Sequence, residues 1–285
     1  MNSPNRNSIV ALVLLAVTSA QGPGCVSDST SGPQAPGQDA GTADTHSSDS
    51  AQDSRSDDAR AARSDGAQEA GSVTWTYHDK DVRLYLPAPT GKPLPVMMYL
   101  HACNNDNVWA GDWIVSALND VEPCAVLLPT APPAIDFTCA DWGGTYDQAE
   151  RPNLTDALAV LDQVIEQYGF DRKRQYVYGE SMGGEGVYRL LMDYPTRFAG
   201  AVAAAGYTVD TGASKLAQTP LWIFHGSADG TASVDNARAI YKSILGAGGS
   251  KVKYTEYADL DHVPAIQQAR GEPGLFDWLL AQHRD

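Results

Sequence analysis

The stretch Gln175-Tyr176-Val177-Tyr178-Gly179-Glu180-Ser181-Met182-Gly183-Gly184 decides the fold. Its first four residues read as a buried strand, and an amphipathic helix is expected over 184–193. A sharp turn from strand to helix forces the central Ser181 into strained dihedral angles and brings the two backbones close together. The residues two before and two after Ser181 must then be small, as Gly179 and Gly183 are. The alternative is a tight turn with an incidental serine.

Strands and helices are expected to alternate around this turn. A hairpin is predicted over 73–86, centred on Asp79-Lys80, and a helix from Pro152 to Gly169. Further apolar runs predict strands over 96–100, 125–128, 199–205, 221–224 and 252–257, and helices over 233–246 and 273–282. This alternation is typical of a doubly wound, mostly parallel α/β sheet with flanking helices.

Composition divides the 285 residues into three parts. Residues 1–25 combine Arg6 with an apolar run over 9–17 and then small residues, which predicts an export signal too short to span a bilayer. Residues 26–71 are rich in Ser, Asp, Ala, Gly and Gln and are predicted to be a disordered linker. Residues 72–285 hold all six Trp and are predicted to form the folded catalytic domain.

The signal ends in Gly22-Pro23-Gly24-Cys25, which resembles a bacterial lipoprotein signal in which the Cys is acylated. Lipidation of Cys25 would anchor the protein to a membrane facing the periplasm or the cell surface. Ordinary secretion after a different cleavage is the alternative. The remaining cysteines, Cys103, Cys124 and Cys139, are an odd number, so we expect one disulfide and one buried free thiol. Cys124 with Cys139 is a possible pair, but the sequence does not choose among the three pairings.

The formal net charge of −15 argues against nucleic acid as a partner, because a phosphate backbone needs a basic surface. It also disfavours electrostatic attraction to an anionic membrane, which leaves an N-terminal lipid as the expected membrane contact. No Cys or His spacing suggests zinc, and no cofactor is expected. The expected partner is a small or polymeric ester. The sequence does not indicate an oligomeric state.

A serine hydroxyl becomes a nucleophile when an imidazole takes its proton and a carboxylate orients that imidazole. In α/β folds with such a turn, the chain order is serine, acid, histidine. Asp229 follows the predicted strand 221–224, and His262 follows the predicted strand 252–257. Ser181, Asp229 and His262 are therefore the predicted catalytic triad.

Other acids and histidines near these positions fit less well. Asp259 and Asp261 are rival acids, but they are too close in sequence to His262 to reach across to its imidazole. His225 lies on the acid loop itself, where a structural hydrogen bond is expected, and His283 is expected at the surface. A metal site at the Asp-x-Asp-His run would need a second His at ligand spacing, which is missing.

Backbone N–H groups are expected to stabilise the oxyanion that forms during acyl transfer. One should be that of Met182, at the start of the helix. The other should come from the loop His101-Ala102-Cys103-Asn104-Asn105, where we expect Cys103, with Asn104 as the nearest competitor.

From about Val73 to Arg284 the sequence resembles secreted, lid-less α/β-hydrolases. This family covers polyhydroxybutyrate depolymerase-like, feruloyl and acetylxylan esterases, and proteins labelled as predicted peptidases. The stretches that carry the resemblance are Leu100-His101-Ala102-Cys103, Tyr178 to Gly184, Tyr194 to Ala199, Phe224-His225-Gly226 and Phe276 to Leu280. The resemblance implies the same triad and the same oxyanion donors, Cys103 and Met182. Two positions depart from it, because Ala102 and Asp261 stand where the family usually has Gly.

The interval from Gly206 to Thr219 is too short for a helical lid, so no lid domain is expected. An open cleft suits bulky or polysaccharide-linked esters, and Trp109, Trp113 and Trp142 are candidates for stacking on a sugar, with core packing as the alternative. The sequence therefore predicts an exported serine esterase. A serine peptidase of the same fold and a non-catalytic binding lipoprotein remain as alternatives.

Overall fold

A computed structural model describes residues 70–103, 107–131, 142, 152–208 and 212–285, with residues 107–112 and 152 described by their backbone alone. The predicted signal, Cys25 and nearly all of the predicted linker lie outside the described residues. Within the described part of the chain, no helix combines the length and the hydropathy needed to cross a membrane.

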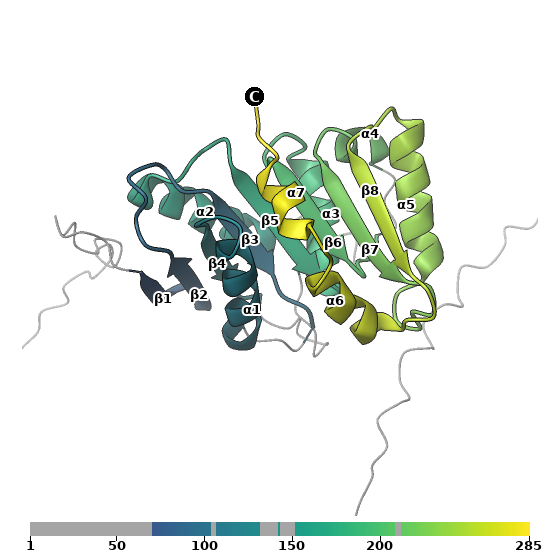
Figure 1. Cartoon of the computed structure of the whole chain (residues 1–285), viewed down its shortest axis with the longest axis horizontal. Coiled ribbons are helices and arrows are strands. Elements are labelled where there is room, and N and C mark those ends of the chain that lie inside the picture. The colour runs from purple at the N-terminus through teal and green to yellow at the C-terminus, as the bar shows by residue number, and fades with distance from the viewer. Residues whose placement is uncertain (1–69, 104–106, 132–141, 143–151, 209–211) are drawn as a thin grey trace, which may run out of the picture. The chain divides into compact units, whose positions relative to one another are not determined.

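Eight strands form one sheet in the order β1-β2-β4-β3-β5-β6-β7-β8 (Figure 1). The strands are β1 (Gly71–Tyr77), β2 (Lys80–Leu86), β3 (Val96–Leu100), β4 (Ala125–Pro129), β5 (Gln175–Glu180), β6 (Gly200–Ala204), β7 (Leu221–Gly226) and β8 (Val252–Tyr257). β2 runs antiparallel to both β1 and β4, and all other neighbours are parallel. The carboxyl ends of the parallel strands therefore meet at one edge of the sheet.

Helices cover both faces of the sheet. They are α1 (Asn107–Asn119), α2 (Pro152–Tyr168), α3 (Met182–Asp193), α4 (Ala213–Leu216), α5 (Val234–Gly246), α6 (His262–Arg270) and α7 (Leu275–Leu280). The apolar side chains of α2, α3, α4 and α5 pack on one face, and those of α1, α6 and α7 pack on the other. The predicted doubly wound α/β layer is confirmed.

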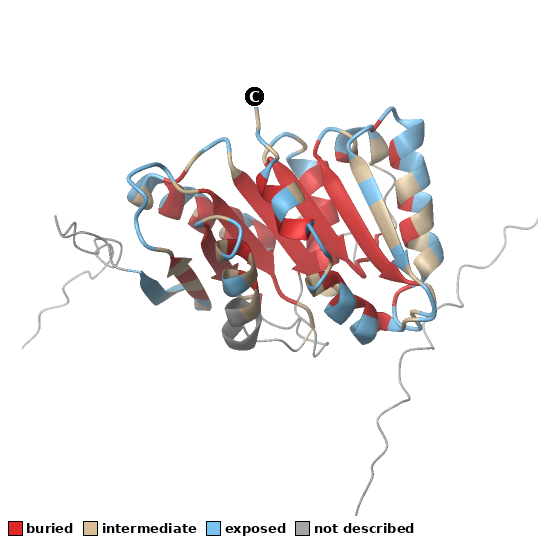
Figure 2. Cartoon of the chain, in the orientation of Figure 1, coloured by how far each residue is buried: buried red, intermediate tan, exposed pale blue. Residues whose placement is uncertain are grey.

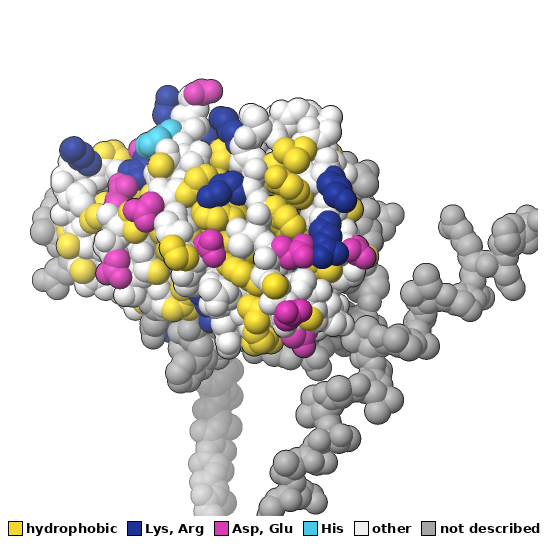
Figure 3. Space-filling model, turned by 45° about the vertical axis from the view of Figure 1, so that its right-hand side comes forward, with side chains coloured by type: hydrophobic (Ala, Val, Ile, Leu, Met, Phe, Trp, Pro, Cys, Tyr) yellow, Lys and Arg dark blue, Asp and Glu magenta, His cyan; other side chains and the backbone are white. Residues whose placement is uncertain are grey.

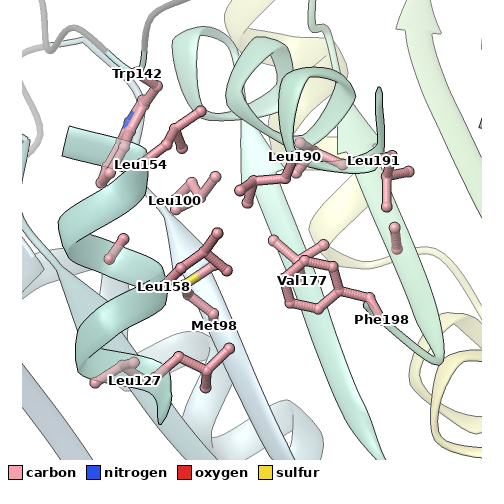
Figure 4. Packing of buried hydrophobic residues seen from close by; sticks show 14 of the residues in the cluster. Met98, Leu100, Leu127, Trp142, Leu154, Leu158, Val177, Leu190, Leu191 and Phe198 are labelled. Carbon is pink, nitrogen blue, oxygen red and sulfur yellow. The ribbon is translucent and has the colours of Figure 1, made fainter. Parts of the chain in front are cut away.

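The core follows the two-residue period of the strands. In β5, Val177 faces the α2 and α3 side, whereas Tyr176 and Tyr178 face the α1 and α7 side. The central strands are buried on both faces, as their continuous apolar runs predicted (Figure 2). Close packing around Val177 by leucines of α2 and α3 is visible in Figure 4.

Three local features differ from the sequence-based expectation. The β1–β2 turn is at His78 and Asp79, one residue earlier than predicted, and both have positive φ, 47° and 61°. Helix α1 was not predicted, and it includes the position of Trp109, whose side chain is not described. Helix α6 was not predicted either, because Pro264 in its third position disfavours a helix interior. Proline is tolerated in a first turn, where the backbone N–H has no acceptor within the helix.

The two described Trp candidates for a sugar cleft are core residues. Trp142 is fully buried beside Leu154, and its Nε1 donates a hydrogen bond to the His101 carbonyl at 2.9 Å (Figure 4). Trp113 lies on α1 and contacts the rings of Tyr99 and Tyr178 at centroid distances of 6.2 and 5.6 Å. Stacking of sugars on Trp142 is therefore excluded by its burial, and Trp113 packs mainly into the core.

The interval between β6 and β7 is short, as predicted. β6 ends at Ala204 and β7 begins at Leu221, and α4 is the helix described between them. On the face drawn in Figure 3, Lys and Arg side chains lie among Asp and Glu side chains and do not gather into a basic stripe on the residues drawn in colour.

The described cysteines divide into one disulfide and one thiol. Cys103 is disulfide-bonded, and its partner lies outside the described residues. Cys124 is a free, fully buried cysteine. The expected combination of one disulfide and one buried thiol is thus found, and the suggested Cys124–Cys139 pair is wrong.

Burial raises the pKa of the Cys124 thiol far above its usual value, so the reactive thiolate is strongly disfavoured in the folded protein. We expect iodoacetamide at pH 8 to leave Cys124 unmodified in the native protein and to alkylate it in 6 M guanidinium chloride without reductant. Peptide mass mapping measures both states. Rapid alkylation of Cys124 in the native protein would contradict its burial beneath α1.

Candidate active site

Ser181 occupies the turn between β5 and α3 in a backbone conformation that side-chain-bearing residues rarely adopt, with φ 53° and ψ −117°. Its N–H donates to the Ala204 carbonyl at 2.8 Å, which continues the hydrogen bonding between β5 and β6. The two flanking glycines are required sterically. A Cβ on Gly179 would lie 2.1 Å from the Gly183 oxygen, and a Cβ on Gly183 would lie 1.9 Å from the Leu100 oxygen.

The structure brings Ser181, His262 and Asp229 together. Ser181 Oγ lies 2.8 Å from His262 Nε2, and His262 Nδ1 lies 2.7 Å from Asp229 Oδ2. A carboxylate only accepts hydrogen bonds, so Nδ1 carries the imidazole proton and Nε2 presents a lone pair to the serine hydroxyl. This arrangement allows a proton to pass from Ser181 to His262.

Asp229 is held on the loop after β7 by several donors. Its side chain is fully buried, and Oδ1 accepts hydrogen bonds from the N–H groups of Thr231 and Ala232 at 2.9 and 2.8 Å. Burial by itself raises the pKa of Asp229, but hydrogen bonds from His225, His262 and the Ala232 N–H outweigh it and hold this pKa well below its ordinary value. Asp229 is therefore a carboxylate at neutral pH.

His225 contributes a second imidazole to the Asp229 carboxylate. Its Nε2 lies 2.9 Å from the Ala232 carbonyl and 3.2 Å from Asp229 Oδ2, so Nε2 carries the proton and faces two acceptors. The side chain is fully buried. The expected structural hydrogen bond of His225 is confirmed, and its contact with Asp229 is an addition that the sequence did not reveal.

His262 is the first residue of α6, and Asp261 caps that helix. Asp261 Oδ1 accepts hydrogen bonds from the His262 N–H at 2.7 Å and from the Gly230 N–H at 3.0 Å. One side chain thus joins the loop of the acid to the helix of the base, and these two backbone donors lower the pKa of Asp261. A capping carboxylate is a gain over the glycine expected here, because glycine has no side chain to accept these bonds.

The loop after β3 lies against the start of α3. A Cβ on Gly183 would lie 1.9 Å from the Leu100 oxygen and 2.9 Å from the His101 oxygen, so the end of β3 and the first residue after it contact the first turn of α3. His101 is buried. Its Nε2 accepts from the Ala131 N–H at 3.0 Å, and its Nδ1 donates to the Ala102 carbonyl at 2.9 Å. The Cys103 position is described, whereas the rival donor Asn104 lies outside the described residues.

The other candidates are placed away from the imidazole. Asp261 contacts the backbone N–H of His262 and not its ring, and the Asp259 N–H donates to Ser227 Oγ at 2.8 Å. His283 is exposed near the carboxyl terminus. Within the described ranges, no group of three or more His, Cys, Asp or Glu side chains has an arrangement that could hold a metal ion.

Sequence comparisons find partial similarity to known hydrolases. A model of the prolyl oligopeptidase family matches residues 141–212, about a quarter of the chain, which includes Ser181. The chain is also 28% identical over 147 residues, 51% of its length, to the bifunctional acetylxylan esterase/xylanase XynS20E of Neocallimastix patriciarum. The match spans 20% of that protein, a fifth of its length.

Solved structures share the fold. A thermostable esterase has a TM-score of 0.63 at 24% identity, covering 76% of this chain and 64% of its own. An acetyl xylan esterase from Aspergillus awamori has a TM-score of 0.60 at 16% identity, covering 73% of this chain and 98% of its own. The predicted α/β-hydrolase fold is confirmed, and the chain is similar to esterases and peptidases that have it.

Steric exclusion at the turn predicts a sharp difference between two glycines. We expect Gly179→Ala to lower the free energy of unfolding by about 2–3 kcal/mol, because its Cβ overlaps backbone that cannot move aside freely. Gly246→Ala is the control, since nothing lies within 4 Å of a Cβ at that helical position. Urea unfolding measures both, and equal stability of the two variants would contradict the steric argument.

Ionised Asp229 stabilises the folded state because folding lowers its pKa. This contribution is complete above the unfolded pKa of about 3.9 and is lost as the pH falls towards the folded value. We expect Asp229→Asn to be less stable than wild type at pH 7, and the difference to shrink by about 1 kcal/mol at pH 3. Urea unfolding at both pH values measures it, and a difference that stays constant or grows in acid is the opposite result.

Proposed function

We propose that this chain is an exported serine esterase that hydrolyses carboxylic esters through Ser181, His262 and Asp229. The observation that carries the proposal is the continuous hydrogen-bonded path from the Ser181 hydroxyl through the imidazole to a buried carboxylate, with distances of 2.8 and 2.7 Å. Ser181 also occupies a strained turn that requires two glycines. Such strain is typical of functional sites, where it positions a reactive group, and supports Ser181 as the nucleophile.

In the acylation step, Ser181 Oγ attacks the ester carbonyl carbon while His262 Nε2 takes the hydroxyl proton. Asp229 stabilises the imidazolium that forms, and the negative charge moves to the carbonyl oxygen. The N–H groups of Met182 and Cys103 are the proposed donors to that oxygen. Collapse of the tetrahedral intermediate breaks the ester C–O bond, and His262 returns the proton to the leaving alcohol, leaving an acyl-Ser181.

Deacylation repeats these roles with water. His262 takes a proton from a water molecule, the resulting hydroxide attacks the acyl carbon, and the proton passes to Ser181 Oγ as the carboxylic acid departs. The water needs access to the acyl carbon, and the short connection between β6 and β7 favours such access.

Bulky or polysaccharide-linked esters are the proposed substrates. The matched protein from Neocallimastix patriciarum is named for acetylxylan esterase activity, and a structural neighbour is an acetyl xylan esterase. The short connection between β6 and β7 adds support, because a polymer-borne ester needs an open approach.

A serine peptidase is the second candidate. The match of residues 141–212 to the prolyl oligopeptidase family favours it, because that family is named after a peptidase. The same triad would serve, with an amine in place of the alcohol as leaving group. A non-catalytic binding lipoprotein is a third candidate, which the intact Ser181–His262 contact disfavours.

Export is part of the proposal and rests on the sequence of residues 1–25, with a lipid on Cys25 as the proposed anchor. The disulfide at Cys103 supports export, because such bonds persist in oxidising compartments.

We expect Ser181→Ala to lower ester turnover about a millionfold, the loss typical of a removed triad nucleophile. Wild type and variant are compared on p-nitrophenyl acetate, feruloyl esters, acetylated xylan and peptide anilides. Ser214→Ala is the matched control, since Ser214 is exposed on α4. Esters cleaved equally by wild type and Ser181→Ala would remove the proposal, and cleavage of anilides but not esters would replace it with the peptidase.

A further inference from the structure

Glu180, the residue before Ser181, is a charged side chain with no exposed surface. It is the last residue of β5 and stands between Gly179 and the nucleophile. Burying a carboxylate is costly unless it is paired and hydrogen-bonded. The partners of the Glu180 carboxylate therefore indicate its structural role.

Two side chains, Arg270 and Tyr99, donate hydrogen bonds to the Glu180 carboxylate. Arg270 Nε donates to Oε1 at 2.8 Å and Arg270 Nη2 donates to Oε2 at 2.6 Å, which is a bidentate pair. The Tyr99 hydroxyl donates to Oε2 at 2.8 Å. The Arg270 guanidinium also lies over the Trp113 ring, 5.0 Å from its centroid. Tyr99 thus holds the Glu180 carboxylate, and Trp113 packs against the Arg270 guanidinium.

Arg270 is the last residue of α6, and His262 is the first. A helix of this length is a rigid rod of about 13 Å. One end of the rod carries the base and is joined to the acid loop through Asp261. The other end is joined to the residue that precedes the nucleophile. In Figure 1, α6 lies along the edge of the sheet where β5, β6 and β7 end.

We propose that Glu180 and Arg270 are positioning residues, whose ion pair fixes the helix of the base to the strand of the nucleophile and so maintains the Ser181–His262 contact. This inference rests on the proposed function. The Glu180 carboxylate is buried and the Arg270 side chain is partly exposed. Such a pair is often no more stabilising than apolar packing of similar volume, so its orientation of two segments is the property that distinguishes it. Displacement of a catalytic group by about 1 Å costs on the order of 100-fold in rate.

The chain offers a matched control at the opposite end of the same strand. Arg174 directly precedes β5, and its Nη1 and Nη2 donate to the two Glu122 oxygens at 2.5 and 2.6 Å. This pair is also bidentate and partly buried, but neither residue adjoins Ser181 or α6. Breaking either pair leaves a charge without its partner and should destabilise the fold, but only the Glu180–Arg270 pair joins the segments that carry Ser181 and His262.

The test compares Arg270→Lys with Arg174→Lys in the full chain. Each keeps the positive charge and loses the bidentate geometry. We expect both to lower the urea midpoint, but only Arg270→Lys to lower kcat, by roughly 10- to 100-fold with KM nearly unchanged. The rate of Ser181 labelling by a fluorophosphonate should fall by the same factor, because that reaction also needs the imidazole. The Arg174→Lys protein should keep kcat within about twofold.

A second variant separates loss of positioning from a defect in folding. Glu180→Gln combined with Arg270→Met removes both charges, so that no unpaired charge stays buried. We expect it to fold and still to show the lower kcat and labelling rate. Wild-type kcat in this double variant, or in a folded Arg270→Lys, would overturn the positioning role. A wild-type protein that neither hydrolyses esters nor reacts with the fluorophosphonate would instead overturn the proposed function.

Discussion

Ser181 is held in a conformation with φ 53°, and backbone carbonyls on both sides leave space for hydrogen atoms alone at Gly179 and Gly183. Such a conformation costs roughly 1–3 kcal/mol and persists only where the surrounding structure enforces it. The strands on either side of β5 and the helix after it supply that enforcement. The N–H of Ser181 binds the end of β6, and α3 begins one residue later against the end of β3. The fold therefore presents a serine hydroxyl at the edge of the sheet at the expense of local strain.

The parallel topology brings the other two side chains to the same edge. Asp229 follows β7 and His262 follows β8, and the carboxyl ends of parallel strands lie together. Asp229 and Ser181, which lie 33 and 81 positions before His262 in the chain, thereby come within hydrogen-bonding distance of its imidazole. Backbone N–H groups and His225 then fix the Asp229 carboxylate, and Asp261 joins the loop of Asp229 to the start of α6.

Much of this arrangement can be read from sequence, because its signals are local. The apolar run before Ser181 and the glycines around it predicted the turn, and the apolar run before Asp229 together with the chain order serine, acid, histidine predicted the acid. Helix α6 escaped prediction because a proline stands in its first turn and its Asp261 cap resembles any loop aspartate. Helix α1 has no acidic residue in its first turn and no basic residue in its last, so the usual end signals were missing. The Glu180–Arg270 pair joins residues 90 positions apart, and a sequence pattern carries no information on such a pairing. The burial of Trp142 likewise could not be predicted, because it lies in a loop sequence and packs against residues that are distant in the chain.

The disulfide at Cys103 lies within the loop that faces the start of α3. A covalent cross-link limits how far this loop can move without any contribution from apolar packing. Glutathione in a cytosol would keep the sulfur reduced, and the loop would then lose this covalent restraint while the His101 hydrogen bonds remain. The stiffness of the segment beside the start of α3 is thus coupled to the redox potential of the surroundings.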